Sequence, residues 1–337
     1  MQEARFYEKR EENKVHCYLC AHGCVIDPRK RGICMVRENR EGTLYSLVYG
    51  KIISQNIDPI EKKPLFHFLP GSRSFSIATV GCNLQCEYCQ NWEISQYPRF
   101  EPKDIPGQEM TPAQVVDRAQ ATGSASISYT YTEPTIFGEF AYDTAVVARE
   151  QGIRNVFVSN GFMSERSAKA MAEILDADNI DLKSFNDSFY RKICKARLQP
   201  VLTTIELMKE LGVWIEVTTL VIPGLNDSDQ ELQEIAKFLV GVDPAIPWHV
   251  SAFYPAYKML NRPRTPAATL QRARQIGLDA GLRYVYTGNI PGDEGEKTFC
   301  YACGAVVIDR VGFSIRHNYL KDGACSKCGT RIDGIWQ

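Results

Sequence analysis

The amino-acid sequence predicts an α/β fold, a partial parallel barrel of the (βα)6 type flanked by small cysteine-rich extensions. From residue 74 onward, short β-prone runs alternate with longer stretches of helical composition, which is typical of βα units around a parallel sheet. Six or seven such runs favour an incomplete barrel, although an open doubly wound sheet gives nearly the same pattern. With 337 residues, of which 44% are hydrophobic, the chain can bury one principal core and carry appendages.

The expected elements follow from the spacing of apolar residues along the chain. Thr111, Ser164 and Asp227 have side chains suited to cap the helices that follow them. The segment 96–107 contains three prolines and is expected to be an ordered loop. We expect strands at 75–80, 126–132, 155–159, 179–183, 214–221, 248–254 and 283–287, and helices at 112–121, 165–175, 201–211, 229–239 and 269–280.

Eleven of the twelve cysteines fall into three clusters, which divide the chain. We expect an N-terminal cysteine-rich extension at 1–73, the partial barrel at 74–290 and a zinc-ribbon-like segment at 291–337. Close pairs of cysteines suit shared metal coordination in a reducing compartment better than disulfides.

The charge and the N-terminal composition indicate where the chain works. A formal net charge of -1 gives no electrostatic reason to expect nucleic acid or an acidic membrane as a partner. The first residues are charged and polar, and no stretch approaches the length of a membrane-spanning helix. We therefore expect a cytoplasmic protein that acts on a small molecule or a protein.

The central cluster, Cys82, Cys86 and Cys89, places three thiolates on one loop after the first expected strand. Three thiolates can bind three irons of a 4Fe-4S cubane and leave the fourth iron open to a ligand, whereas an electron-transfer cluster is normally held by four. The alternative is a zinc site completed by a distant histidine. The open iron favours catalysis over electron transfer.

The two terminal clusters predict further metal sites. Cys300, Cys303, Cys325 and Cys328 form two knuckles separated by β-prone segments, as in a zinc ribbon; a rubredoxin-like iron or an auxiliary cluster is the alternative. Cys17, Cys20, Cys24 and Cys34 leave zinc and an iron-sulfur cluster both open, with structural zinc slightly favoured. His16, His22 and His67 are expected at the surface or beside the metals, and the alternative is that they substitute as ligands.

Cys194 stands alone in the sequence, among Arg191, Lys192, Lys195 and Arg197. Four cations would favour a thiolate, which could donate hydrogen or bind a substrate. The alternative is a small apolar residue packed at the start of a helix.

The central motif, with Tyr88 before its last cysteine, resembles that of radical S-adenosylmethionine enzymes. Residues 131–134, 159–161, 181–183 and 222–227 resemble the successive motifs of pyruvate formate-lyase activating enzymes. The resemblance departs at Val158, where the activases have aspartate, and at Glu216, where they have arginine, which puts the ribose contact and the activase reaction in doubt.

The resemblance implies a cofactor site. The open iron would be chelated by the amino and carboxylate groups of S-adenosylmethionine, and one electron would release a 5'-deoxyadenosyl radical that abstracts hydrogen from a substrate. Glu133 would bind the methionine ammonium, Lys183 its carboxylate with Asp181 orienting it, and Tyr88 would border the adenine. Ser159 and Asn160 complete the expected cofactor-binding set.

A closer resemblance runs over nearly the whole chain. Residues 57–67 and 82–96 resemble the radical enzyme of the AmmeMemoRadiSam system, whose name implies association with AMMECR-type and Memo-type proteins. An electron donor such as flavodoxin or ferredoxin is also expected. The alternatives to a radical enzyme of unidentified substrate are an activase of a glycyl-radical enzyme and a non-catalytic metal-binding scaffold.

Overall fold

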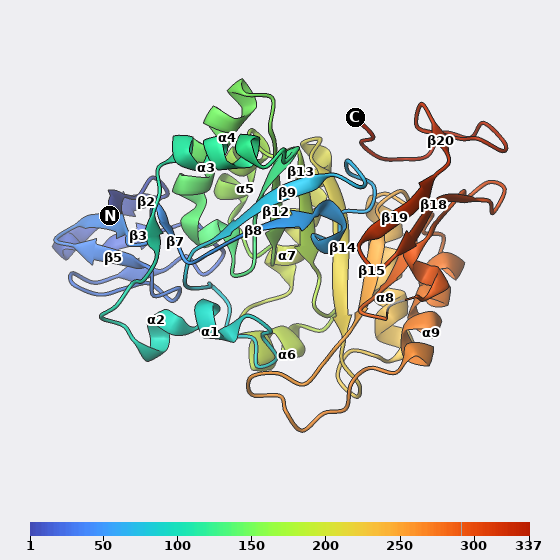
Figure 1. The fold of residues 1–337 in the computed structure, drawn as a ribbon. Helices are drawn as coiled ribbons and strands as arrows, with labels where there is room; N and C mark the ends of the chain where they lie inside the picture. Colours follow the sequence, from blue (N-terminus) through green and yellow to red (C-terminus); the bar gives the residue numbers. More distant parts are fainter. Residues whose placement is uncertain (291) are drawn as a thin grey trace.

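The computed structural model describes residues 1–290 and 292–337 and is organised around one eight-stranded sheet (Figure 1). Its strand order is β16-β15-β14-β13-β12-β11-β9-β8, and the seven strands from β16 to β9 run parallel. The predicted α/β fold with a parallel sheet is therefore confirmed. The parallel strands are β9 (Arg73–Ala78), β11 (Ser126–Tyr129), β12 (Arg154–Ser159), β13 (Ala177–Asp181), β14 (Trp214–Val221), β15 (Trp248–Ala252) and β16 (Val285–Gly288).

Helices connect the parallel strands and cover the sheet (Figure 1). Their start residues have the expected chemistry at Thr111, which makes a capping box with Gln114, and at Ser164, which accepts from the Ser167 amide. The helices are α3 (Pro112–Ala121), α4 (Gly138–Glu150), α5 (Glu165–Ala172), α7 (Gln199–Glu210), α8 (Asp229–Val242) and α9 (Ala267–Asp279).

Three expectations for these connections were wrong in detail. Helix α4 was missed, because it begins at a glycine and follows a β-prone run. The segment 96–107 contains the short helix α2 (Tyr97–Phe100), since Pro98 fits the first turn of a helix. Ser228 rather than Asp227 caps α8, and the Asp227 carboxylate instead accepts from the Gly224 amide.

The N-terminal extension forms two small sheets and also joins the main one. Strand β8 (Ser54–Pro59) lies within residues 1–73 but pairs antiparallel with β9, so this extension is continuous with the central sheet. Its other strands are β1 (Gln2–Glu3), β2 (Tyr7–Lys9), β3 (Val15–Cys17), β4 (Val25–Ile26), β5 (Arg37–Arg40), β6 (Thr43–Ser46) and β7 (Lys51–Ile52), which pairs with β10 (Gln108–Glu109).

The C-terminal segment lies at the opposite end of the molecule from the N-terminal sheets (Figure 1). It contains β17 (Thr298–Phe299), β18 (Val306–Val311), β19 (Ser314–Asn318), β20 (Leu320–Lys321) and β21 (Ala324–Cys325). Its own small core packs Cys300, Val307 and Cys325 against Tyr284 and Tyr286 of the barrel. The segment is thus anchored on the last strand of the sheet.

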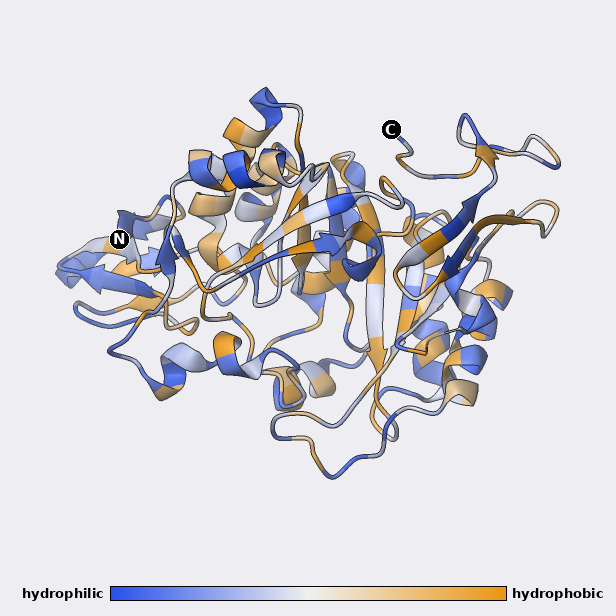
Figure 2. Cartoon of the chain, viewed as in Figure 1, coloured by the Kyte–Doolittle hydropathy of each residue, from blue (hydrophilic) through white to orange (hydrophobic). Residues whose placement is uncertain are grey.

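The central strands are buried on both faces, which is what helices on a parallel sheet require. Ile77, Ile127, Phe157, Val217 and Val250 are all fully buried. Figure 2 shows apolar residues along the central strands and polar residues on the outer helices. Among the residues described, no helix is both long and apolar enough to cross a membrane.

Candidate cofactor site at the carboxyl ends of the strands

The loop that carries the central cysteines follows β9, at the carboxyl edge of the parallel sheet, where α/β proteins bind ligands. Contacts from three directions fix its backbone. The Arg99 guanidinium donates to the Cys82 carbonyl at 3.1 Å, and the Gln96 amide donates to the Leu84 carbonyl at 3.2 Å. The Gln85 amide donates to the Cys194 carbonyl at 2.9 Å. The loop is therefore held in place by the fold around it.

All three thiols are free and line one cavity of about 450 Å³. Most of the residues expected to bind a cofactor line the same cavity, namely Tyr88, Ser159, Asn160, Asp181 and Lys183. The sequence motifs, which are spread over about a hundred residues, thus converge at one place in the fold. A larger cavity of about 610 Å³, lined by Ser164, Asp187 and Arg197 among others, contains none of the predicted site residues.

The spacing of the thiols bears on what they can hold. Two thiolates on one zinc ion lie at most about 4.6 Å apart, twice a zinc–sulfur bond of about 2.3 Å. In the described part of the chain, the one group of histidine, cysteine or carboxylate ligands whose donor atoms all lie within 4.8 Å of one another is Cys300, Cys303, Cys325 and Cys328. The central thiols are more widely spaced, which suits a multi-iron cluster.

The surroundings of the central sulfurs also fit a cluster. The Leu84 amide donates to Cys82 Sγ at 3.3 Å, and the Ser95 hydroxyl lies 3.3 Å from Cys89 Sγ. Hydrogen bonds to the sulfurs are one way a protein tunes an iron-sulfur cluster. Burial, with a further contribution from nearby negative charge, raises the pKa of Cys82 and of Cys89. Bound iron would supply the positive charge that holds such thiols deprotonated.

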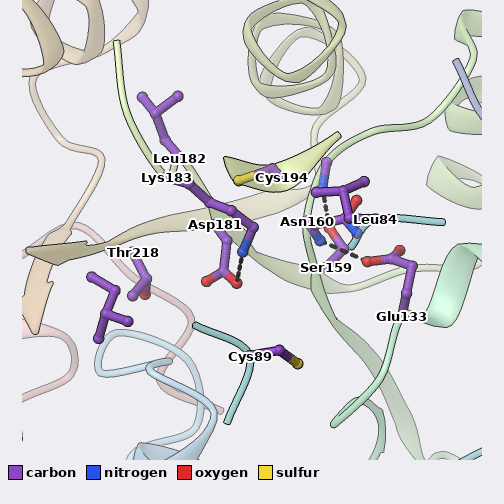
Figure 3. A network of polar contacts seen from close by, with 12 residues as sticks. Leu84, Cys89, Glu133, Ser159, Asn160, Asp181, Leu182, Lys183, Cys194 and Thr218 are labelled. Carbon is purple, nitrogen blue, oxygen red and sulfur yellow. Dashed lines mark hydrogen bonds and ion pairs between the residues drawn. The ribbon is translucent and has the colours of Figure 1, made fainter. Parts of the chain in front are cut away.

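Lys183 and Asp181 form an ion pair at the end of β13, 2.8 Å between Nζ and Oδ2 (Figure 3). Burial lowers the pKa of Lys183, but the Asp181 carboxylate and the nearby Cys86 and Cys194 thiolates outweigh burial and raise it. The ammonium group is therefore charged at neutral pH. It lines the cavity and can pair with an anionic group there.

Glu133 and Asn160 connect two strand ends to the cysteine loop. The Asn160 amide donates to Glu133 Oε2 at 2.8 Å (Figure 3), and its side-chain amide donates to Asn83 Oδ1 at 2.8 Å. Burial raises the pKa of Glu133 to about 7, against the lowering effect of hydrogen bonds from Thr135 and Asn160. Glu133 is not one of the described residues that line the cavity. It lies behind Asn160, whose amide it accepts from.

Ser159 lies on the cavity wall, but its hydroxyl is already engaged. It donates to Asp178 Oδ2 at 3.1 Å and accepts from the Gly161 amide at 3.3 Å. Val158, at the departure from the activase motif, also lines the cavity. The Asn160 side chain is engaged as well, since its amide group donates to Asn83 and its Oδ1 accepts from the Phe162 amide at 3.0 Å.

Cys194 is fully buried at the end of a single π-helical turn, Tyr190–Cys194, and not at a helix start. The Tyr88 hydroxyl lies 3.8 Å from its sulfur. Burial raises the pKa of Cys194, but contact with Cys86, the charge of Lys183 and Tyr88 outweigh burial and lower it. In the described part of the chain, Cys194 is not among the residues that line the cavity. The cation that lowers its pKa is Lys183, and not one of its basic neighbours in the sequence.

Sequence reasoning missed a buried polar network around Lys63, which also lines the cavity. The Lys63 ammonium, 2% exposed, lies 2.6 Å from Asp58 Oδ2 and 4.5 Å from the centre of the Tyr131 ring. Tyr131 donates to the same carboxylate and has a left-handed backbone with φ of 64°. Burial lowers the pKa of Lys63 to about 8, although Asp58 opposes this. No local signal in the sequence marks Lys63 as buried.

Other cavity residues come from the ends of later strands and from both extensions. Thr218, Ser251 and Asn289 could have been found only by following each parallel strand to its carboxyl end. Phe313, from the turn between β18 and β19, also lines the cavity although it belongs to the C-terminal segment. The cavity is therefore completed by residues from outside the barrel.

Glu216, where the chain departs a second time from the activase motif, makes hydrogen bonds that have a structural role. Its carboxylate is fully buried and accepts from the amides of Phe66 and His67 and from His249, at 2.6 to 3.0 Å. It fastens the end of the 57–67 motif to the central sheet. His67 is likewise buried, with its ring bonded to Tyr286 and the Asp333 carbonyl.

The terminal cysteine sets differ from each other. Cys300 and Cys328 lie 3.6 Å apart, and Cys303 and Cys325 lie 3.8 Å apart, at the distances of thiolates on one ion. In the N-terminal set, burial together with the other three thiols raises the pKa of Cys20. Its four cysteines are thus close neighbours without meeting the single-ion spacing within the described residues.

Comparison with known proteins agrees with this geometry. The model of the Radical SAM superfamily matches residues 76–239. An uncharacterized protein of Methanocaldococcus jannaschii is 48% identical over 99% of both chains. A putative glycyl-radical enzyme activating enzyme of the same organism is 24% identical over 61% of this chain and 78% of its own. The crystal structure of Streptococcus suis SuiB bound to precursor peptide SuiA covers 69% of this chain and 52% of its own, at 13% identity and a TM-score of 0.50.

A parallel α/β sheet with three free thiols lining a cavity at its carboxyl edge has the ligands for an iron-sulfur cluster with one open iron. Residues 76–239 belong to the radical SAM superfamily. Membership implies a 4Fe-4S cluster and binding of S-adenosylmethionine. Its homologues include activating enzymes, and the fold is shared with structures of that superfamily.

Proposed function

We propose that this chain cleaves S-adenosylmethionine reductively at a 4Fe-4S cluster held by Cys82, Cys86 and Cys89. When bound, the cluster and cofactor supply a 5'-deoxyadenosyl radical that abstracts hydrogen from a substrate not yet identified. The observation that carries the proposal is the convergence of three thiols, spaced too widely for one ion, with the Asp181–Lys183 pair on one cavity wall. A scaffold protein would have no need of such a cavity.

The chain's own residues would bind and orient the cofactor. The Lys183 ammonium is suited to the methionine carboxylate, with Asp181 fixing its position. Asn160 offers a side-chain amide, and Tyr88 a buried ring, for the nucleoside end. Glu133, which lies behind Asn160 and has a pKa of about 7, would become fully ionised as the methionine ammonium approaches, because a nearby cation favours the charged carboxylate.

Cys194 is better suited to positioning than to chemistry on the substrate. Its sulfur contacts Tyr88, and its carbonyl accepts from the Gln85 amide on the cysteine loop. A Cys194→Ala variant should shift the electron paramagnetic resonance spectrum of the reduced cluster, because hydrogen bonding around Cys86 changes. An unchanged spectrum together with full turnover would remove Cys194 from the site.

The finer identity we propose is the radical enzyme of the AmmeMemoRadiSam system, a cytoplasmic protein with zinc in its C-terminal segment. AMMECR-type and Memo-type proteins would be its partners, and flavodoxin or ferredoxin its electron donor. The second candidate is an activase of a glycyl-radical enzyme, which the relationship to a putative activating enzyme favours. An activase would transfer hydrogen from a glycine of a protein partner, whereas the first reading also admits small molecules.

The test is formation of 5'-deoxyadenosine. The protein is reconstituted without oxygen, given dithionite and S-adenosylmethionine, and assayed for the nucleoside. A Cys89→Ser variant should form none, while Cys303→Ser, which changes a thiol of the C-terminal set, should match the natural protein. No nucleoside from protein with an assembled central cluster would reject the proposal in favour of a scaffold.

A further inference from the structure

The N-terminal cysteines sit on a folded frame with a small apolar core, to which Cys17 also contributes. Cys17 ends β3, Cys20 and Cys24 lie in the turn to β4, and Cys34 lies in the loop before β5. The Cys17 amide donates to the Cys24 carbonyl at 2.9 Å, which closes the turn. Ala4, Val15, Leu19, Ile26 and Leu44 form an apolar core beneath this turn. Four free thiols are thus gathered on a rigid support.

Their spacing differs from that of the C-terminal set. The sulfurs of the four C-terminal cysteines all lie within 4.8 Å of one another, as one ion requires. In the part of the chain that the structure describes, neither the four N-terminal nor the three central sulfurs meet this limit. We propose that Cys17, Cys20, Cys24 and Cys34 bind a second 4Fe-4S cluster, which passes electrons to the central one. With four thiolate ligands no iron is left open, so this cluster would transfer electrons and not bind substrate.

A buried arginine provides an independent sign of a ligand at this place. Arg37, 1% exposed, pairs through Nη1 with Glu139 at 2.9 Å. Its Nε and Nη2 groups are buried and have no hydrogen-bond partner among the described residues. Burial lowers the pKa of Arg37, but the charge of Glu139 and, to a smaller extent, the thiolates of Cys17 and Cys34 outweigh burial and raise it. Both thiolates are therefore close to the guanidinium. Such N–H groups are suited to the sulfide and thiolate sulfurs of a cluster.

Two direct contacts join this frame to the central cysteine loop. His22, between Cys20 and Cys24, has its Nε2 2.8 Å from the carbonyl oxygen of Asn83, the residue after Cys82. On the other side of Cys82, Gly81 has a φ of 99°, and a Cβ there would lie 3.3 Å from the Cys34 carbonyl oxygen. The hydrogen bond starts at His22, two residues from Cys20 and from Cys24, and the close approach starts at Cys34. Both end at residues covalently bonded to Cys82.

The frame also reaches the surface, where a donor can approach. Cys20 and Cys24 are half-buried, and Val25 and Ile33 beside the set are 65% and 40% exposed. A low-potential one-electron donor protein would reduce the N-terminal cluster, which passes that electron to the central cluster and returns to its oxidised state. The electron is consumed when the carbon–sulfur bond of the cofactor is broken, so this role, but not the cluster itself, rests on the proposed function.

The first experiment needs no enzymatic activity. The natural protein and a Cys82→Ser/Cys86→Ser/Cys89→Ser variant are reconstituted without oxygen and assayed for iron, sulfide and zinc. We expect two cubanes in the natural protein and one in the variant, with zinc in both. In the reduced natural protein, two cluster signals are expected in electron paramagnetic resonance, and S-adenosylmethionine should shift only one. A single cluster signal, with zinc enough for both terminal sets, would overturn the proposal.

The second experiment tests the relay. Cleavage is driven either by reduced flavodoxin or by dithionite, in the natural protein and in Cys20→Ser/Cys24→Ser, with Cys303→Ser/Cys328→Ser as the matched control. The ratio of flavodoxin-driven to dithionite-driven cleavage should fall about tenfold or more in the first variant and stay constant in the control. Equal ratios would reject the relay while leaving the iron content to decide the cluster. A protein that makes no deoxyadenosine with either donor would instead count against the proposed function.

Discussion

The central and the C-terminal cysteine sites solve different problems with the same side chain. Cys82, Cys86 and Cys89 line a cavity, lie on one loop and are spaced beyond the reach of one ion. Cys300, Cys303, Cys325 and Cys328 come from two turns, are packed within 4.8 Å of one another and stand away from the cavity. A closed set of four ligands leaves no position for another molecule, whereas an open set of three does.

The difference teaches that the number of cysteines is less informative than what surrounds them. The central thiols are backed by the whole sheet, so removing them would change the chemistry and leave the fold. The C-terminal segment has a core of only a few apolar residues, so a metal bound by its four cysteines would contribute much of its stability. Variants in the two sites should therefore fail in different measurements.

The largest effect is expected for Cys86→Ser in the central site. With one ligand lost, the cluster is not held in a state that can take the cofactor, so deoxyadenosine formation should fall to background. Zinc content and the thermal midpoint should stay as in the natural protein. Cleavage retained at a tenth or more of the natural rate would mean that Cys86 is not a cluster ligand.

Loss of the C-terminal metal should affect stability instead. For Cys300→Ala we expect loss of zinc and a fall of roughly 5–10 °C in the midpoint of thermal unfolding, since structural zinc contributes several kcal/mol to folding. Hydrogen exchange should accelerate mainly in residues 298–335. Cluster content should be unaffected, and the comparison fails if iron rather than zinc leaves with this thiol.

Loss of the buried Lys63–Asp58 pair should destabilise the protein more than loss of the more exposed Lys62–Asp58 pair. Lys63→Met leaves the Asp58 carboxylate without its buried partner and should reduce the free energy of unfolding by roughly 2–4 kcal/mol. Lys62→Met removes a half-exposed partner of the same carboxylate and should cost less than about 1 kcal/mol. Urea unfolding of both variants measures the difference, and equal losses would contradict the assigned burial.

The same lysine predicts a pH dependence. Its pKa is lowered by burial to about 8 from 10.5, so between these values the unfolded chain holds a proton that the folded chain has released. The contribution of Lys63 to the free energy of unfolding therefore rises with pH across this window. Subtracting the curve of Lys63→Met from that of the natural protein should reveal the rise, and a falling difference would refute the direction of the shift.

The smallest effect is expected where the two regions meet. Phe313 belongs to the C-terminal segment, is 50% exposed and lines the cavity. Phe313→Ala should leave metal content and cofactor cleavage within about twofold of the natural protein, because the side chain touches no predicted ligand. Once a substrate is identified, its KM should rise. An unchanged KM would mean that the C-terminal segment takes no part in substrate binding.

The sequence was sufficient to predict the sheet and the convergence of the motifs. Strand 214–221 and helix 112–121 were predicted to the residue, because their apolar patterns are long and well bounded. Cavity residues named from motifs, such as Lys183 and Asn160, were found because parallel strands bring their carboxyl ends together.

Contacts between distant segments were beyond the sequence. Nothing local indicates that Phe313 reaches the cavity, or that Lys63 is buried against Asp58 and Tyr131. The charge around Cys194 was misjudged, because neighbours in sequence on a helical turn point in different directions, and the cation that matters is Lys183. Side-chain direction and tertiary burial decide such cases.

The central claim is that one iron of the middle cluster is left free by the polypeptide for S-adenosylmethionine. Electron-nuclear double resonance on the reduced, oxygen-free protein, with the cofactor labelled with ¹⁷O in its carboxylate or ¹⁵N in its amino group, tests this directly. We predict hyperfine coupling from both labels to the central cluster, lost in Cys86→Ser. No coupling in protein with an intact central cluster, or a fourth side chain bound to its last iron, would contradict the account.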